Sequence, residues 1–273
     1  NRNIKIVHYV APSVWNWRPG RINTVAKAVD HLLTILPFEK EIFDREKIQT
    51  TFVGHRITDT DLSIYNDVKA TDIDKDIKKP IFLILPGSRR SEVKRLLPIF
   101  LDSLEICSFK DQFDFILPTT DSMIQLVKEI IIKSSTKLKV KIINDEHKKF
   151  QCFYLADYGL IASGTVGLEL SYFDVTYLST YKLNPISYFL LHFLVKSKLA
   201  NLINVILGKM VIPELLQANC NVANINKELD KLINDEKYRI EVKSQVNKAI
   251  KALFAGRSPS IIAAETILNI VNR

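Results

Sequence analysis

The chain has 273 residues, with 38 Lys and Arg against 30 Asp and Glu, which gives a formal net charge of +8 at pH 7. Hydrophobic residues make up 47% and charged residues 25%, as in ordinary globular proteins, and this balance excludes long disordered stretches. With only 8 glycines, collagen-like and glycine-rich linker proteins are excluded as well. At about 100–200 residues per domain, we expect one or two domains.

The spacing of cysteine and histidine predicts neither a disulfide framework nor a metal site. Cys107, Cys152 and Cys220 are far apart, form no C-x-x-C pair and are odd in number. The five histidines lack metal-ligand spacing. We therefore expect a reducing, cytosolic compartment and no metal. No signal peptide follows Asn1, and no apolar run reaches the ~18 residues of a membrane span.

The first 79 residues predict two strands, one helix and a linker. Apolar residues concentrate in 4–10 and 51–55, as is typical of strands, and recur at helical spacing in 20–33. Residues 56–79 are polar and rich in aspartate, which favours a linker.

From Pro80 onward, short apolar runs alternate with helical patterns. The expected strands are 80–85, 113–117, 140–143, 158–162 and 175–181, and the expected helices are 91–107, 122–132, 148–155 and 165–173. This alternation predicts an α/β fold with a doubly wound parallel sheet, followed from Asn184 by a mostly helical C-terminus. In such sheets ligands bind at the carboxyl ends of the strands, so the loops after the strands are the candidate sites.

The first such loop carries Ser88 and Arg89 between a buried strand and a helix. Backbone N–H groups at a helix N-terminus attract anions, and arginine can bind phosphate oxygens in bidentate fashion. This loop is either a diphosphate clamp centred on Arg89 or a capped helix with a solvated arginine pair.

A second loop contains Ser163, Gly164 and Thr165 at the start of a helix. Ser163 or Thr165 can cap the helix, and Gly164 lets a phosphate approach the backbone. Glu169 lies one turn beyond Thr165 and can accept hydrogen bonds from a ribose diol. The alternative is a capped helix with a buried, paired glutamate. Because both loops follow strands of one sheet, they support each other, and nucleotide binding is favoured.

Three further features have two interpretations each. The Trp15–Trp17 loop either stacks on a ligand or packs on the core. The span 175–213 has no Asp or Glu and either lies on an anionic membrane or forms a core helix with lysines at its edge. Glu214 and Gln217, after Pro213, are expected to be neighbours on one helix face, which either lines a ligand pocket or is simply an exposed first turn. No nucleic-acid recognition motif accompanies the positive charge.

Taken together and in order, these segments resemble lipid-A-disaccharide synthase. The matching pieces are HYVAPSVW (8–15), LPFE (36–39), VGH (53–55), LPGSR (85–89), ASGT (162–165), YK (181–182), NP (184–185) and ELLQ (214–217). The resemblance covers nearly the whole chain. It implies a GT-B-like fold, with a partial N-terminal Rossmann-like domain that binds the acceptor and a C-terminal domain that binds the sugar nucleotide.

The resemblance also implies an inverting hexosyltransferase. It would transfer diacylglucosamine from UDP-2,3-diacylglucosamine to 2,3-diacylglucosamine 1-phosphate, giving lipid A disaccharide phosphate and UDP, without a cofactor beyond the donor. Such enzymes of Gram-negative bacteria are peripheral on the cytoplasmic face of the inner membrane. The implied donor-site residues are Ser88, Arg89, Ser163, Gly164, Thr165, Glu169, Asn204, Glu214 and Gln217. His8 is a candidate for the base, which is otherwise expected in an absent segment.

The main departure from the family is at the start. The family's first strand, with its Gly-Glu-Ala-Ser-Gly-Asp loop, and a later aspartate loop are not present after Asn1, so about 100 residues are expected to be absent. We divide the chain into an acceptor-domain remnant (1–57), a linker (58–79), a UDP-sugar-binding domain (80–255) and a C-terminal helix packing back on the N-terminal part (256–273). A homodimer and a separate N-terminal polypeptide are possible partners. The alternatives are a remnant that only binds UDP and a nucleotide-sugar epimerase of the same fold.

Overall fold

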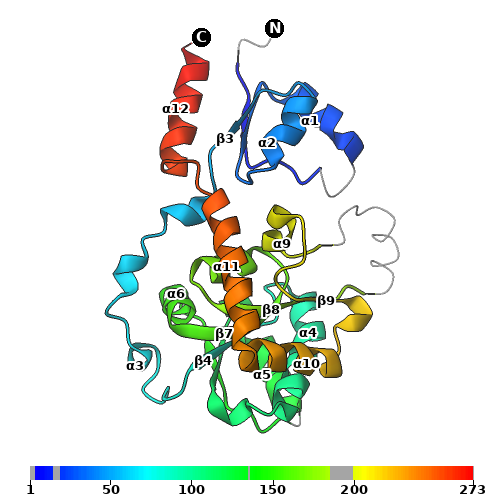
Figure 1. Cartoon of the computed structure of the whole chain (residues 1–273), viewed down its shortest axis with the longest axis vertical. Helices are drawn as coiled ribbons and strands as arrows, with labels where there is room; N and C mark the ends of the chain where they lie inside the picture. Colours follow the sequence, from blue (N-terminus) through cyan, green and yellow to red (C-terminus); the bar gives the residue numbers. More distant parts are fainter. Residues whose placement is uncertain (1–3, 15–18, 135, 185–198, 273) are drawn as a thin grey trace. The chain divides into compact units, whose positions relative to one another are not determined.

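The computed structural model describes residues 4–14, 19–134, 136–184 and 199–272, and the chain divides into two compact units (Figure 1). The smaller unit contains the residues up to Thr60 and those from Lys248 onward. The larger unit contains residues 61–184 and 199–247. The expected membrane-facing helix around Tyr188–Val195 and the Trp15–Trp17 loop lie outside the described residues.

Among the described residues, the larger unit is built on a sheet of six parallel strands. These are β4 (Ile81–Leu85), β5 (Asp114–Pro118), β6 (Val140–Ile143), β7 (Ala156–Ala162), β8 (Thr176–Tyr181) and β9 (Glu214–Leu216). Their order is β6-β5-β4-β7-β8-β9, with every neighbouring pair parallel. Along the chain, β5 and β6 are added on one side of β4. The chain then crosses to the other side of β4 and adds β7, β8 and β9. This is the doubly wound arrangement predicted from the sequence, which is thereby confirmed.

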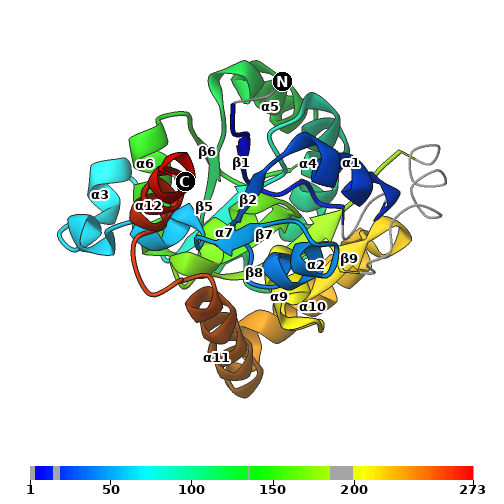
Figure 2. The same ribbon diagram turned by 90° about the horizontal axis from the view of Figure 1, so that it is seen from above.

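Helices lie before, between and after these strands. They are α3 (Ala70–Ile73), α4 (Arg90–Ile106), α5 (Asp121–Lys133), α6 (Glu146–Leu155), α7 (Thr165–Tyr172), α9 (Leu202–Leu207), α10 (Val222–Asn234) and α11 (Glu236–Ala252). Short 3-10 helices of this unit are η3 (Leu62–Tyr65), η4 (Lys110–Gln112) and η5 (Gln217–Asn219), whereas η2 (Arg56–Asp59) belongs to the smaller unit. The expected linker at 56–79 thus contains η2, η3 and α3. Figure 2 shows α3 beside α6, which it contacts.

Alternating side chains of the central strand pack on the two faces of this sheet. Phe82 and Ile84 belong to a buried cluster with residues of α4, α5 and α10. Leu83 points to the opposite face, where a Cβ placed on Gly159 would lie 3.6 Å from Leu83 Cβ and 3.5 Å from Leu170 of α7. All five residues of β4 are buried, as the continuous apolar run predicted. The helices therefore cover both faces and leave the strand ends for a ligand.

The described part of the smaller unit has a three-stranded parallel sheet in the order β1-β2-β3. Its elements are β1 (Val7–Tyr9), η1 (Pro19–Arg21), α1 (Ile22–Ala28), β2 (His31–Thr34), α2 (Glu39–Arg45), β3 (Thr50–Phe52) and α12 (Pro259–Val271). The single helix predicted over 20–33 is wrong in its second half, because the chain turns after α1 and forms β2. Leu32 and Leu33 are both fully buried, and so short an apolar run fits a helix and a central strand equally well.

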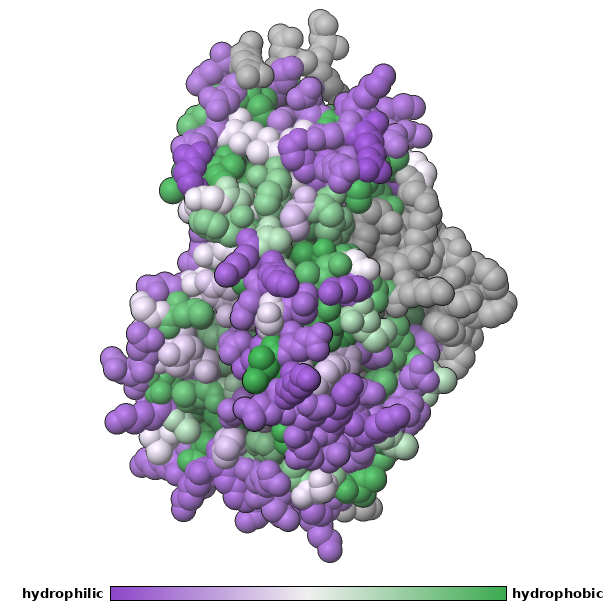
Figure 3. Space-filling model, in the orientation of Figure 1, coloured by the Kyte–Doolittle hydropathy of each residue, from purple (hydrophilic) through white to green (hydrophobic). Residues whose placement is uncertain are grey.

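The C-terminal helix α12 is strongly apolar, yet most of its surface is exposed. Ser258 and Ser260 donate hydrogen bonds from their hydroxyls to Asp59 Oδ2, at 2.9 and 3.2 Å. Leu268 and Val271 are 60% and 68% exposed, and Figure 3 shows hydrophobic side chains at the surface over this helix. No described helix combines the length and hydropathy needed to cross a membrane.

His55 follows β3, and we expect it to make the smaller unit less stable in acid. Burial, together with the positive charge of Arg56, lowers the pKa of His55 from 6.5 to about 4. Its Nδ1 accepts a hydrogen bond from Ile57 N at 3.2 Å, which protonation there would break. At pH 5 the unfolded chain binds a proton at this position and the folded chain does not, so stability falls as the pH drops below about 6.5.

Between pH 7 and pH 5 we expect the free energy of unfolding of the smaller unit to fall by about 1 kcal/mol because of His55. This value allows for the partial exposure of the His55 side chain. The His55→Asn variant keeps a hydrogen-bond acceptor but has no group that titrates in this pH range, so it should lack the pH-dependent part of the stability that His55 provides. Urea unfolding at both pH values, followed by fluorescence of Trp15 and Trp17, measures the difference. An equal loss in wild type and variant would contradict the prediction.

Candidate functional site

The candidate site lies where four strands of the larger unit end side by side. In the sheet register, Leu85 of β4 pairs with Ile161 of β7, and Tyr181 of β8 pairs with Leu216 of β9. The loops that follow these parallel strands therefore emerge at one edge. Strands are added in one direction from β4 to β6 and in the opposite direction from β7 to β9, so the direction changes between β4 and β7. In doubly wound sheets, ligands bind in the crevice at this point.

The loop after β4 presents Arg89 at the start of α4. Arg89 is the N-cap residue with an extended backbone, and its N–H donates to Glu92 Oε2 at 3.3 Å. Its guanidinium donates from Nη1 to Glu92 Oε1 at 2.7 Å, and this pairing raises the pKa of Arg89. The Arg89 side chain is 77% exposed, and Ser88 beside it is exposed as well. The loop thus offers a permanent positive charge to a ligand at the strand ends.

Gly87 allows this loop to close tightly over Glu92. Its φ of +107° is accessible to glycine and strained for other residues. A Cβ at this position would lie 2.4 Å from Glu92 Oε2 and 2.8 Å from Glu92 Cβ. The glycine is therefore required for the loop shape that presents Arg89.

The loop after β7 leads into the N-terminus of α7 without a side-chain cap. Ser163 N donates to Thr180 O at 2.6 Å, which fixes the loop on β8. The N-cap residue is Gly164, so the expectation that Ser163 or Thr165 caps the helix is wrong. A Cβ at Gly164 would meet nothing within 4 Å, and Gly164 and Thr165 are both exposed. Helix N–H groups that no side chain satisfies are available to an anion.

Glu169 lies one turn further along α7 and pairs with a lysine that the sequence did not single out. Lys149 Nζ of α6 is 3.2 Å from Glu169 Oε2, and both side chains are about 30% exposed. The ammonium group also lies 4.8 Å from the Phe150 ring centroid and 5.1 Å from that of Phe153. Because this pair joins two helices 20 residues apart, no local pattern in the sequence could have indicated it.

Glu214 belongs to β9, so the prediction of a helix after Pro213 is wrong. Ser179 N of β8 donates to Pro213 O at 3.0 Å, and Ser179 pairs with Glu214 in the ladder. Glu214 and Gln217 are therefore not neighbours on a helix face. Gln217 begins η5, and its Oε1 accepts a hydrogen bond from Leu183 N at 3.3 Å, which fixes the loop after β8.

Asn204 and Glu214 are buried and bonded within the chain. Asn204 Nδ2 donates to Ile212 O at 2.8 Å and also to Glu214 Oε1. Asn204 Oδ1 accepts from the N–H groups of Val211 and Ile212, both at 2.8 Å. Asn204 is fully buried and Glu214 is 8% exposed. Of the predicted donor residues, these two shape a loop, whereas the others lie in or just after the loops that follow β4, β7 and β9: Ser88, Arg89, Ser163, Gly164, Thr165, Glu169 and Gln217.

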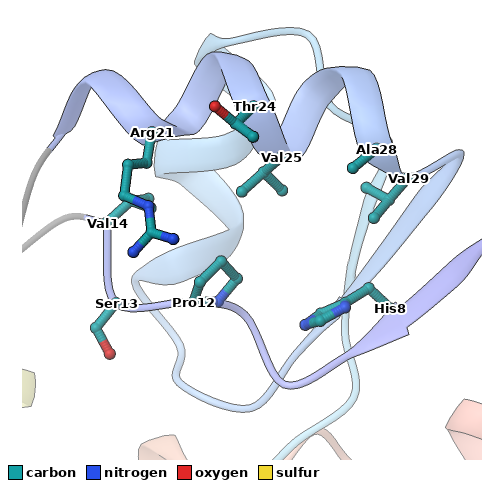
Figure 4. A pocket seen from close by; sticks show the side chains of 9 residues that line it. All are labelled: His8, Pro12, Ser13, Val14, Arg21, Thr24, Val25, Ala28 and Val29. Carbon is teal, nitrogen blue, oxygen red and sulfur yellow. The ribbon is translucent and has the colours of Figure 1, made fainter.

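His8 lies in the smaller unit, at an apolar pocket of about 290 Å³. His8 and Arg21 stand at opposite ends of this pocket, with Pro12 and Val25 between them and Val29 near His8 (Figure 4). His8 is exposed and therefore accessible to a substrate. In the described ranges, no group of three or more His, Cys, Asp or Glu side chains could hold a metal ion.

Comparison with known proteins identifies related sequences over nearly the whole chain. A family model described as lipid-A-disaccharide synthetase matches residues 1–266. The lipid-A-disaccharide synthase of Rhodospirillum centenum is 34% identical over 98% of this chain and 67% of its own length. That of Persephonella marina is 36% identical, over 92% of this chain and 68% of its own. The chain thus spans about two-thirds of the length of these relatives.

Solved structures with low sequence identity share the fold. A UDP-GlcNAc 2-epimerase from Neisseria meningitidis, bound to UDP-GlcNAc, has a TM-score of 0.65 and 15% identity, covering 98% of this chain and 71% of its own. A putative UDP-N-acetylglucosamine 2-epimerase from Listeria monocytogenes has a TM-score of 0.59 and 12% identity, covering 85% of this chain and 59% of its own. The predicted GT-B-like α/β fold is confirmed, and the epimerases are distant neighbours of that fold. The family model and the relatives together show that this chain belongs to the lipid-A-disaccharide synthase family.

Proposed function

We propose that the larger unit binds a UDP-sugar at the edge where β4, β7, β8 and β9 end, and that it provides the donor site of a lipid-A-disaccharide synthase. The observation that supports this most directly is the pairing of two anion-binding features at the reversal point of the sheet. Arg89 supplies a charge after β4, and the uncapped N-terminus of α7 supplies N–H donors after β7. Both features are suited to binding a diphosphate.

The reaction is the transfer of diacylglucosamine from UDP-2,3-diacylglucosamine to 2,3-diacylglucosamine 1-phosphate, which yields lipid A disaccharide phosphate and UDP. As the glycosidic bond breaks, negative charge grows on the departing diphosphate. Arg89 and the α7 N-terminus stabilise that charge, with Ser88, Ser163, Gly164 and Thr165 in contact with it. Glu169 takes the ribose hydroxyls, while Asn204, Glu214 and Gln217 hold the loops around the pocket.

Inversion at the anomeric carbon also requires a base that removes the proton of the acceptor hydroxyl. His8 remains a candidate because its ring is exposed beside the apolar pocket of the smaller unit. We assign the acceptor to that unit. The apolar lining of the pocket suits an acyl chain, and Arg21 at its end suits a phosphate group.

Further proposals concern partners and location. We infer a peripheral association with the cytoplasmic face of an anionic membrane, supported by the acid-free span 175–213 with its lysines. The exposed apolar side chains of α12 are consistent with a covering partner, either a second copy or a separate N-terminal polypeptide. The alternative to the enzyme is a chain that only binds UDP.

Disaccharide formation tests the enzymatic proposal. The chain is assayed alone and together with an upstream polypeptide from a relative, using both lipid substrates and mass spectrometry of the product. Product in either mixture supports the transferase. Absence of product in both, combined with calorimetric binding of UDP, would overturn the transferase in favour of the alternative.

Replacement of Glu169 by alanine tests the ribose contact. We expect a loss of about tenfold in UDP affinity, because a carboxylate that bonds a ribose diol is worth ~1.4 kcal/mol or more. Affinity for 2′,3′-dideoxy-UDP should not fall, since that ligand lacks both hydroxyls. The mutation also leaves Lys149 without its carboxylate partner. Because this change affects both ligands alike, comparing UDP with the dideoxy ligand removes it from the result. Glu129→Ala, on an exposed position of α5, is the control. Equal losses for both ligands would refute the ribose assignment.

A further inference from the structure

We propose that Tyr177 is a positioning residue for the donor site. Its buried hydroxyl links the phosphate-binding helix α7 to the segment 199–216 and thereby sets the orientation of the N-terminus of α7. This inference rests on the donor site proposed above and adds to it a device outside the residues that contact the ligand.

Tyr177 projects from β8 into the interior and is 1% exposed. Its hydroxyl lies 3.0 Å from Ser171 Oγ, in the last turn of α7, and accepts a hydrogen bond from Asn201 Nδ2 at 3.1 Å. Burial raises the pKa of Tyr177 to about 12, so the hydroxyl keeps its proton at neutral pH. With Asn201 as the donor to its oxygen, Tyr177 can donate this proton to Ser171.

Asn201 carries the link from Tyr177 into the next segment. Its Oδ1 accepts from Ile203 N at 2.9 Å and so caps α9, while its own N–H donates to Glu214 Oε1 at 3.1 Å. Glu214 Oε2 accepts from Ala200 N at 2.8 Å. Glu214 connects this network to β9. Asn204, which bonds to Glu214, connects it to the backbone of residues 211 and 212.

All the polar side chains of this network are buried. Ser171 is 3% exposed, and Asn201 and Asn204 are fully buried. A buried donor or acceptor that loses its partner costs more than the bond itself contributed, so the network has one well-defined arrangement. Removing one hydroxyl therefore affects every element that the network joins.

Gly167 shows how the network acts on the phosphate-binding end of α7. A Cβ there would lie 3.0 Å from Asn201 Nδ2 and 3.1 Å from the Tyr177 hydroxyl, so α7 packs directly against both polar atoms. Gly167 N donates to Gly164 O at 3.2 Å, which places Gly167 in the turn that presents N–H groups to the diphosphate. Any displacement of Tyr177 or Asn201 is therefore transmitted to that turn. Preorganised donors lose much of their effect when misaligned by a fraction of an ångström.

The Tyr177→Phe variant removes the hydroxyl oxygen and leaves the ring. We expect calorimetry on the full chain to show a five- to tenfold loss of UDP affinity. Ser103→Ala is the matched control. It removes a fully buried hydroxyl of α4, bonded to Ile99 O at 2.6 Å, in the same unit but outside the network. The control should lower the unfolding temperature to a similar extent and leave UDP affinity within twofold.

The double variant Gly167→Ala/Tyr177→Phe separates positioning from a general loss of stability. Gly167→Ala alone should weaken UDP binding, because the added methyl presses on Asn201 Nδ2 and on the tyrosine oxygen. With that oxygen removed, the double variant should lose less affinity than the product of the two single losses. A general loss of stability would give no such compensation.

Wild-type affinity for UDP in Tyr177→Phe would overturn the inference while leaving the donor site intact. If Tyr177→Phe does not fold, Ser171→Ala breaks the same contact with a smaller change in volume, and unchanged affinity there would also overturn it. If the wild-type chain itself does not bind UDP, the proposed function fails first, and the inference with it.

Discussion

We expect the Arg89→Ala chain to bind UDP about 30-fold more weakly than the wild type, a loss of ~2 kcal/mol. Arg89 is the cation of the loop after β4, and a charge-assisted pair with a diphosphate is stronger than a neutral hydrogen bond. The loss stays near 2 kcal/mol because the Arg89 side chain is 77% exposed, and solvent weakens its attraction to the ligand. Isothermal titration calorimetry with UDP measures the change.

Two variants make the Arg89 result specific. Arg90→Ala removes the adjacent exposed arginine at the first residue of α4 and should change UDP affinity by less than twofold. Arg89→Lys keeps the charge but loses bidentate geometry and should fall between wild type and alanine. UDP binding by Arg89→Ala at wild-type strength would show that the diphosphate does not lie at this loop.

The second large effect concerns stability. We expect Phe82→Ala to lower the free energy of unfolding of the larger unit by 3–5 kcal/mol, in the range that large cavities in protein cores cost. Phe82 is fully buried in β4, and its ring centroid lies 5.5 Å from that of Phe115, 5.8 Å from that of Phe113 and 6.2 Å from that of Phe109. Its removal opens a cavity among three aromatic rings directly under the strand that leads to Arg89.

Guanidinium unfolding followed by far-ultraviolet circular dichroism measures the effect of Phe82→Ala. The matched control is Ile132→Ala, because Ile132 of α5 is 81% exposed and its loss should change stability by at most about 0.5 kcal/mol. A cost below about 1 kcal/mol for Phe82→Ala would mean that the aromatic cluster around β4 is not the centre of the core.

Much of the larger unit could be predicted from the sequence because its strands are buried on both faces. A strand of this kind is a continuous apolar run, as in Ile81–Leu85, and the helices between such strands show a different spacing. Once the sheet is parallel and doubly wound, its topology determines where a ligand binds. The loops of Arg89 and Ser163 could therefore be identified without coordinates.

Two short strands escaped prediction for a physical reason. β2 and β9 have four and three residues, and runs this short fit a helix as well as a strand. Their conformation is decided by their neighbours, since β2 pairs with β1 and β3, and β9 pairs with β8. As a result, Glu214 was expected on a helix face but belongs to a strand, with its carboxylate buried.

The sequence by itself determined the fold class of the larger unit, the position of the candidate site and the resemblance to a family, because these depend on local patterns and on their order along the chain. Only the tertiary structure decided which of the candidate side chains are exposed near the strand ends and which are buried and bonded within the chain. Lys149 meets Glu169, and Tyr177 meets Ser171 and Asn201, through contacts between separate elements. Such contacts depend on how helices pack on the sheet, and packing brings together residues whose separation in the chain follows no repeating interval.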